Sequence, residues 1–287
     1  MIAATHWRIG RECALDLSTP QIMGILNVTP DSFSDGGLHE SMEQAVTHAD
    51  RMIAEGATLI DIGGESTRPG AERIDAKTQR DRVVPIITEI ASRHDVPISV
   101  DTTRAEVAIA ALDAGASIIN DVSAGREDAD MLPLAAERGC GLVLMHRLRP
   151  PGEDCWSDAY EHDPDYGGDV VVAVRDWLLA RAGVVEAAGV DRASICLDPG
   201  LGFGKSVAQN WQLVERFASL VDTGYPILAA ASRKSFIGAA TGVTVPADRG
   251  AGSAAVTVLQ VAAGARLLRV HDVALHVAAA VQSMSTR

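Results

Sequence analysis

Short runs of apolar residues alternate along the chain with longer stretches in which apolar residues recur every three or four positions. A short apolar run bounded by turn residues is typical of a strand buried on both faces, and the longer period is typical of an amphipathic helix. The pattern predicts strands at 22–28, 58–63, 97–101, 117–122, 141–146, 194–199, 226–231 and 266–271. It predicts a helix after each strand, at 41–55, 76–92, 104–114, 128–138, 169–188, 207–220, 250–263 and 273–283.

Eight strand–helix units within 287 residues predict a (β/α)8 barrel, and we expect one domain over residues 1–287. Several predicted helices stop just before a glycine, as helices with left-handed C-caps do. The alternative is a doubly wound sheet, which needs fewer strands and usually carries a glycine-rich phosphate loop after its first strand. No such loop follows 22–28. We expect the first residues, to about Leu17, to form a short β-hairpin that closes the barrel bottom.

The composition narrows the classes of function. A formal net charge of -13 argues against nucleic-acid or anionic-membrane partners held by bulk charge. Cys13, Cys140, Cys155 and Cys196 show no metal-binding spacing, so free thiols in a reducing compartment are expected. The first residues lack the charged and apolar regions of a signal peptide, and no apolar run reaches the roughly 18 residues of a membrane span. We therefore expect a cytoplasmic protein.

Every predicted strand ends in a polar or charged group, and ligand groups of (β/α)8 enzymes come from that end. The groups are Asn27, Asp61, Asp101, Asn120 with Asp121, His146, Asp198, Ser232 to Lys234, and Arg269 with His271. Asp and Asn also cap helices, and that reading stays open for Asp61 and Asp121. Together the eight ends indicate a binding site at one mouth of the barrel.

These groups divide by chemistry. Asp101, Asn120 and Asp198 suit a flat heterocycle with an amidine or guanidine edge, which carboxylates grip through paired hydrogen bonds. The cations Arg68, Arg233, Lys234, Arg269 and His271 indicate a site for phosphate or diphosphate. The alternatives are that the acids cap helices or pair with barrel cations, and that the basic residues are solvated on loops.

Three further features carry weaker signals. The segment 198–205 looks like a phosphate loop, but Pro199 stands where that motif needs glycine. Its glycines would instead let the backbone and Phe203 approach a flat ligand. His146 has no partner at metal-ligand spacing, which favours a loop or core histidine. The irregular stretch 147–168 follows the fifth strand, where a loop over the site is expected.

Six segments resemble the dihydropteroate synthases, the pterin-binding barrels of folate biosynthesis, and the match runs from about 22 to 277. They are 27–37, 63–70 (GGESTRPG), 119–122 (INDV), 198–205, 232–238 (SRKSFIG) and 269–273 (RVHDV). The resemblance implies condensation of 6-hydroxymethyl-7,8-dihydropterin diphosphate with p-aminobenzoate, giving 7,8-dihydropteroate and diphosphate. It also implies Mg²⁺ as cofactor, a homodimer, and sulfonamides as inhibitors that mimic p-aminobenzoate.

The resemblance also implies roles for individual residues. The pterin would be held by Asp101, Asn120, Asp198 and Lys234, with Met145 lining its pocket. The diphosphate would be bound by Asn27, Arg68, Arg269 and His271, with Asn27 acting through the metal. The p-aminobenzoate pocket would be shaped by Thr67, Pro69, Phe203, Lys234 and Ser235. Asp31 and Phe33 would lie on a loop that closes over the reaction. The residues expected to act in catalysis are Asn27, Asp101, Lys234, Arg269 and His271.

Some positions depart from the family pattern. Thr103-Arg104-Ala105 replaces a frequent Ser-Lys-Pro, Leu201 replaces a frequent Phe, and 147–151 differs from the common Met-Gln-Gly type. Ala230 stands where a glycine usually precedes the SRKS motif, near the expected pterin plane. Two other functions therefore stay open. A pterin-dependent methyltransferase would need no diphosphate site, and a non-catalytic pterin-binding paralogue has Ala230 as its support.

Overall fold

The computed structural model describes residues 3–28 and 38–285, and its centre is an eight-stranded parallel sheet. The strands are β3 (Gln21–Asn27), β4 (Leu59–Gly63), β5 (Ile98–Asp101), β6 (Ile118–Asp121), β7 (Gly141–Met145), β8 (Ile195–Asp198), β9 (Leu228–Ala229) and β10 (Leu267–Val270). They pair in the order β8-β7-β6-β5-β4-β3-β10-β9. A parallel bridge between Leu197 and Ile227 joins the two end strands. The predicted (β/α)8 barrel is thereby confirmed.

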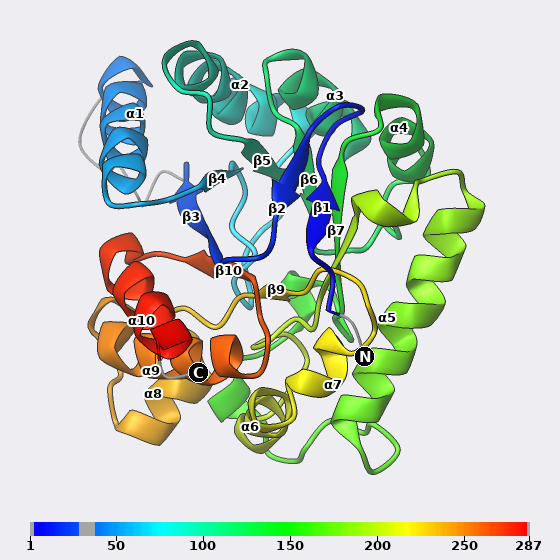
Figure 1. Cartoon of the computed structure of the whole chain (residues 1–287), viewed down its shortest axis with the longest axis vertical. Coiled ribbons are helices and arrows are strands. Elements are labelled where there is room, and N and C mark those ends of the chain that lie inside the picture. Colours follow the sequence, from blue (N-terminus) through cyan, green and yellow to red (C-terminus); the bar gives the residue numbers. More distant parts are fainter. Residues whose placement is uncertain (1–2, 29–37, 286–287) are drawn as a thin grey trace.

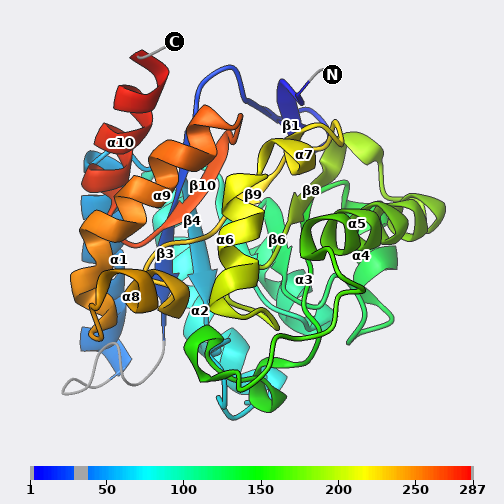
Figure 2. The ribbon, with the colours of Figure 1, turned by 90° about the horizontal axis from the view of Figure 1, so that it is seen from below.

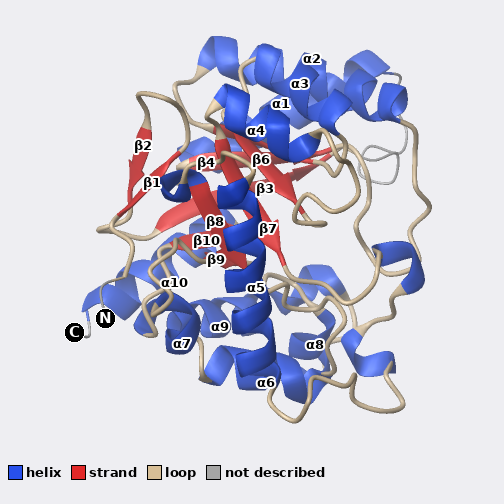
Figure 3. Cartoon of the chain, turned by 90° about the vertical axis from the view of Figure 1, so that its right-hand side faces the viewer, coloured by secondary structure: helices blue, strands red, loops and turns tan. Residues whose placement is uncertain are grey.

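Helices surround the strands on every side (Figure 1 and Figure 3). They are α1 (Leu38–Ala54), α2 (Ala76–Arg93), α3 (Ala105–Asp113), α4 (Met131–Arg138), α5 (Val170–Ala187), α6 (Val207–Glu215), α9 (Gly250–Ala262) and α10 (Val273–Ser285). The helix predicted at 207–220 is divided into α6 and the short α7 (Ala218–Val221). A further helix, α8 (Ser235–Thr241), follows the SRK motif and was not predicted, since seven residues are too few to show a helical period.

Local sequence explains several helix ends. The Asp75 carboxylate caps α2 by accepting the Thr78 N–H at 2.7 Å. Ser206 and Gln209 form a capping box at the start of α6. Gly139 ends α4 in the left-handed conformation, with φ of 62°. Asp61 does not cap the helix that follows it, and Asp121 instead accepts the N–H groups of Ser123 and Gly125 in the turn after β6.

The bottom of the barrel is closed by the predicted hairpin, which consists of β1 (His6–Arg8) and β2 (Ala14–Asp16). Trp7 is fully buried and its indole N–H donates to the Ser194 carbonyl at 2.9 Å. It packs in one apolar cluster with inward-facing strand residues, Met23, Leu59, Ile118, Val143, Cys196, Leu228 and Leu267. Figure 2 shows the hairpin and both chain ends at one end of the barrel, opposite the long segments that follow β4 and β7. The bottom is therefore filled, and the other mouth is left for chemistry.

The segment 147–168 is irregular, as predicted, and contains two short 3-10 turns, Pro151–Glu153 and Ser157–Ala159. All four cysteines are free thiols. Among the described residues, no helix is long and apolar enough to cross a membrane. Asp31 and Phe33 lie outside the described residues, so their expected place on a closing loop stays a prediction.

Candidate active site

The carboxyl ends of neighbouring strands bring the predicted ligand residues side by side. Asn27 pairs in register with Gly63, Gly63 with Asp101, and Asp101 with Asn120. A Cβ at Gly63 would lie 3.5 Å from the Asp101 Cβ and 3.7 Å from the Asn27 Oδ1, so both groups lie next to Gly63. Met145 and Asp198 are register partners on β7 and β8. The barrel topology thus brings Asn27 and Asp198, which lie 171 positions apart in the sequence, to one mouth.

Arg269 lies among the acids of the mouth and is ion-paired with them. Its Nε donates to Asp61 Oδ2 at 2.6 Å and its Nη2 donates to Asp101 Oδ2 at 2.9 Å. The Asn120 Nδ2 also donates to Asp61 Oδ2, at 3.1 Å. Burial raises the pKa of Asp101 to about 7, although Arg269 opposes this rise. The alternative in which barrel acids pair with barrel cations therefore holds for Asp101. Arg269 lies beside these acids and not in a separate layer of cations.

Asp61 links the acids of the mouth to its cation, a role that its position in the sequence did not predict. It is fully buried, it joins Arg269 to Asn120, and its Oδ1 has no hydrogen-bond partner among the described residues. Its helix-capping alternative is wrong, since Asp75 caps α2. The available signal was a charged residue inside an otherwise apolar strand, where a charge is retained only when it is paired.

Asp198 and Lys234 form a second pair of polar groups beside an apolar wall. The Gly200 N–H donates to Asp198 Oδ1 at 2.7 Å. Burial raises the pKa of Asp198, and burial together with nearby Arg269 lowers the pKa of Lys234 to about 8. The Lys234 ammonium lies 4.1 Å from the centre of the Phe203 ring, a cation–π distance. Phe203 packs with Val122 and Met145 in a small buried cluster, which offers an apolar face to a flat ring.

The cations of the mouth converge on His271. The His271 Nδ1 lies 3.1 Å from the Ser232 Oγ, and its backbone N–H donates to the same oxygen at 3.2 Å. Its pKa lies well below the ordinary value because of burial and the positive charges of four residues, Arg233, Arg269, Lys234 and Arg68. His271 is therefore neutral at neutral pH. A place where four cations act on one neutral imidazole attracts an anion.

Arg233 and Arg68 differ in what holds them. The Arg233 guanidinium is bound by Asp272, with nitrogen–oxygen distances of 3.0 and 2.5 Å, and so it supports the loop after β9. Arg68 is exposed on the segment between β4 and α2, flanked by half-buried Thr67 and Pro69. That segment is fixed to the segment after β7, since the Gly70 N–H donates to the Pro151 carbonyl at 2.9 Å.

Ser235 is the first residue of α8 and is nearly buried. Its Oγ accepts the Ser157 N–H at 3.1 Å. The segment 147–168 therefore reaches across the mouth and contacts a residue expected to bind p-aminobenzoate, as the sequence led us to expect of that segment.

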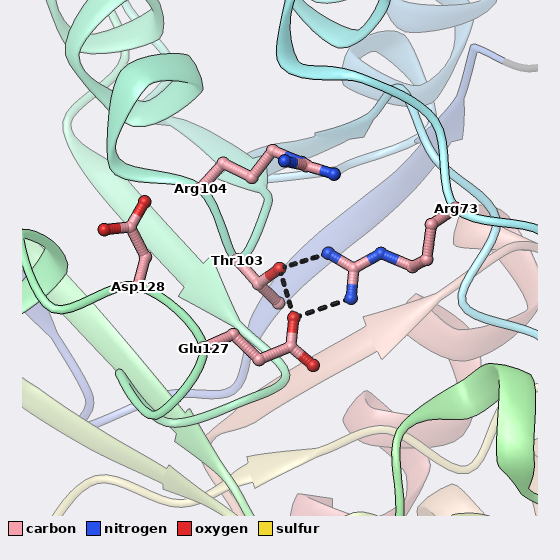
Figure 4. A pocket seen from close by; sticks show the side chains of 5 residues that line it. All are labelled: Arg73, Thr103, Arg104, Glu127 and Asp128. Atoms are coloured by element: carbon pink, nitrogen blue, oxygen red, sulfur yellow. Dashed lines mark hydrogen bonds and ion pairs between the residues drawn. The ribbon is translucent and has the colours of Figure 1, made fainter.

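An open hollow of about 340 Å³ lies beside the mouth and is lined by Arg73, Thr103, Arg104, Glu127 and Asp128 (Figure 4). Arg73 donates to Glu127 at 2.6 Å and to Thr103 at 2.9 Å, and Arg147 also donates to Glu127. Burial raises the pKa of Glu127, but these hydrogen bonds outweigh burial and lower it to about 2. The hollow contains none of the predicted substrate residues. Its shared carboxylate ties together the segments after β4, β6 and β7, a role that the sequence did not reveal.

A closed (β/α)8 barrel whose strand ends join acceptors and cations in one mouth defines a barrel enzyme with a polar, anion-accepting site. The sequence pattern of the pterin binding enzymes matches residues 23–271. A dihydropteroate synthase of Mycobacterium leprae is 47% identical over 264 residues, which is 90% of each chain. The chain belongs to the pterin-binding enzymes, and within them to the dihydropteroate synthases, which are transferases of folate biosynthesis.

Solved structures agree with this assignment. The Xanthomonas albilineans dihydropteroate synthase with 4-aminobenzoic acid has a TM-score of 0.88 and 43% identity, with 98% of both chains covered. The same organism's dihydropteroate synthase in complex with 7,8-dihydropteroate has a TM-score of 0.83 and 41% identity, covering 97% of this chain and 98% of that one.

Proposed function

We propose that this chain joins p-aminobenzoate to 6-hydroxymethyl-7,8-dihydropterin diphosphate, releasing diphosphate and 7,8-dihydropteroate, with its own residues in the roles that follow. The observation that carries the proposal is that hydrogen-bond acceptors and cations lie at the same mouth of the barrel. Asp101 and Asp198 accept hydrogen bonds there, while Lys234 and Arg269 supply positive charge next to them. A substrate with a donor-rich ring and an anionic tail matches both sets.

The pterin would enter between the acids and the apolar wall. Its amino-pyrimidinone edge carries N–H donors, which suit Asp101, Asn120 and Asp198. The described contacts of Asp198 leave Oδ2 without a hydrogen-bond donor, since Gly200 occupies Oδ1. Arg269 occupies Asp101 Oδ2, so the ring would take the other oxygen or displace the guanidinium. The cluster of Val122, Met145 and Phe203 would cover the ring face.

The diphosphate would be bound by Arg68, Arg269 and His271, with Lys234 close by. Arg269 would turn from its carboxylate partners towards the incoming anion, which is the better partner because it carries more charge. His271 is neutral, so it would donate through Nε2 when Nδ1 accepts from Ser232. These groups stabilise charge that grows on the leaving oxygens, and such stabilisation is the main source of rate in this kind of transfer.

Mg²⁺ is part of the proposal, and Asn27 would hold it. The described residues contain no group of three or more His, Cys, Asp or Glu side chains that could bind a metal. That fits Mg²⁺, which commonly takes one or two protein oxygens and completes its shell with water and substrate phosphates. The Asn27 carboxamide oxygen is a hard ligand beside Asp101. When bound, Mg²⁺ supplies further neutralisation of the departing diphosphate.

The second substrate would lie against Thr67, Pro69, Phe203 and Ser235. Its amine nitrogen forms a bond to the pterin methylene carbon as the carbon–oxygen bond breaks. The diphosphate leaves with the bonding electrons, and the amine then loses a proton to solvent or to the diphosphate. An arylamine is already a nucleophile at neutral pH, so positioning replaces a strong base.

The test is diphosphate release by the purified protein, with each substrate and Mg²⁺ omitted in turn. We expect release only in the complete mixture. Pterin binding without release would favour the non-catalytic paralogue, whose support is Ala230, half-buried directly after β9. The cations around His271 argue against a methyltransferase, since that reaction has no diphosphate to bind.

Two finer properties belong to the same proposal. A homodimer is supported by apolar side chains exposed on α9 and α10, Leu259 at 51%, Leu275 at 41% and Val281 at 62%. A cytoplasmic location is supported by the four free thiols. Light scattering at micromolar concentration tests the first property, since a mass near 30.1 kDa would mean a monomer.

A further inference from the structure

Lys205 is a fully buried lysine outside the residues assigned above. Its Nζ donates to the Phe203 carbonyl at 2.8 Å and to the Gly200 carbonyl at 3.0 Å, and it lies 3.0 Å from His146 Nδ1. Below its pKa, which burial lowers to about 7, the Lys205 side chain is an ammonium group whose three protons face three acceptors. His146, which the sequence favoured as a loop or core histidine, therefore has a defined partner.

The two carbonyls that Lys205 binds belong to residues that hold the site. The Gly200 N–H donates to Asp198 Oδ1 at 2.7 Å, so Gly200 links Lys205 to the carboxylate expected to bind the pterin. The Phe203 ring lies under the Lys234 ammonium, 4.1 Å from its centre. Lys205 is thus connected to Asp198 through Gly200, and to Lys234 through Phe203.

The segment leaves no room for a side chain at two of its glycines. Gly200 has φ of +65°, and a Cβ there would lie 1.9 Å from the His146 carbonyl oxygen. At Gly202 a Cβ would lie 3.0 Å from the Lys234 Cδ. The backbone of the segment therefore lies close to His146 at Gly200 and close to the Lys234 side chain at Gly202.

Lys205 places a titratable group where a charge is costly. Burying an ammonium group costs free energy, which its hydrogen bonds to the two carbonyls offset, whereas a methionine of similar length would avoid that cost and leave both hydrogen bonds unmade. The outer part of the segment has other anchors, since Asp154 Oδ2 accepts the Gly204 N–H at 2.7 Å and Tyr166 donates to the Gly204 carbonyl at 2.8 Å. What Lys205 adds is a fixed place for the Gly200 and Phe203 carbonyls.

We propose that Lys205 is a positioning residue for the transfer, which holds Asp198 through Gly200 and Lys234 through Phe203. It touches neither substrate. The proposal rests on the proposed function for its kinetic readout, but its binding readout does not depend on turnover.

The experiment compares Lys205→Met with Tyr166→Phe, which removes one hydrogen bond from the outer part of the same segment. Calorimetry measures the Kd of pterin diphosphate, and diphosphate release measures kcat for each folded variant. We expect Lys205→Met to raise the Kd and lower kcat by about 10- to 100-fold each, as misplacement of binding groups does. Tyr166→Phe should stay within about twofold of the wild type, as expected for a residue that touches no assigned group.

The outcomes are separable. A wild type that binds pterin diphosphate without turnover would refute the proposed function, while the Kd values would still test Lys205. A folded Lys205→Met with wild-type Kd and kcat would overturn the positioning role, as would equal losses in both variants. If Lys205→Met does not fold, nuclear magnetic resonance of wild-type protein labelled with ¹⁵N-lysine decides. At a pH below the Lys205 pKa of about 7, the bound ammonium should show slowly exchanging protons, and fast exchange at Lys205 there would overturn the proposal.

Discussion

Replacing Arg269 by methionine tests the ion pairs that Arg269 forms with Asp61 and Asp101 at the mouth. Arg269 is 16% exposed at its side chain, while its partners Asp61 and Asp101 are 0% and 6% exposed. The substitution removes the single guanidinium that binds both carboxylates, at 2.6 and 2.9 Å. It therefore leaves two acids in a site that water reaches poorly.

The expected loss follows from that burial. Breaking a buried pair by removing one partner costs about 3–5 kcal/mol of unfolding free energy, because the remaining charge stays uncompensated. Arg233→Met is the matched control. Arg233 and Asp272 are 27% and 31% exposed at their side chains. A more exposed pair contributes about 0–1 kcal/mol.

The loss should depend on pH. Asp101 has a pKa of about 7 in the folded protein, raised by burial, against an ordinary 3.8. Arg269 opposes this rise, so removing it raises the pKa of Asp101 in the folded protein further. Between the unfolded and folded values the native state holds a proton that the unfolded chain has released, so stability falls as pH rises through this window. The cost of Arg269→Met should therefore be greater at pH 8 than at pH 5.

Urea unfolding of the wild type and both variants at the two pH values measures these differences. We expect Arg269→Met to lose several times more stability than Arg233→Met at pH 8, and the difference between them to narrow at pH 5. Equal losses in the two variants, or a gap that widens in acid, would refute the assignment of a buried, charge-compensated network at the mouth.

Three other changes are open to direct measurement. Lys234→Ala should lower diphosphate release by at least about 100-fold, since it removes a cation next to the leaving group; near-normal turnover would remove Lys234 from the mechanism. Burial lowers the pKa of Lys205 to about 7 from 10.5, so between these two pH values the unfolded chain holds a proton that the native state has lost. Wild-type stability should therefore rise between pH 7 and 10.5, and Lys205→Met should show a smaller rise in urea titrations. Gly200→Ala should prevent folding or greatly lower the melting temperature, because its Cβ would lie 1.9 Å from the His146 oxygen. Gly70→Ala, also at positive φ but with nothing within 4 Å, should cost only about 1–2 kcal/mol; equal costs would contradict the close packing at Gly200.

The fold was predictable because strand and helix periods differ over most of the chain. The parallel strands β4 to β10 lie within their predicted ranges, and β3 begins one residue before its range, since buried parallel strands form continuous apolar runs. The helix α8 has seven residues, and a segment of less than two helical turns is too short to show a helical period. The division between α6 and α7 was missed because 207–220 remains helical in composition through the break.

The site was predictable as a set of residues but not as a set of contacts. Strand ends identified Asp101, Asn120, Asp198 and Arg269, since the barrel brings them to one mouth. The pairing of Arg269 with Asp61 depends on side-chain reach across the barrel, which sequence spacing does not encode. The same holds for Lys205 and His146, which lie 59 positions apart.

Hydrogen-bond acceptors and cations of one mouth would bind the two halves of one substrate, and a crystal structure with pterin diphosphate is the sharpest test of this arrangement. We expect the bicyclic ring against Asp101, Asn120 and Asp198, with the phosphates of the same molecule against Arg68, Arg269 and His271. A ring bound elsewhere, or phosphates that leave Arg269 paired with its acids and contact none of these three residues, would contradict this arrangement.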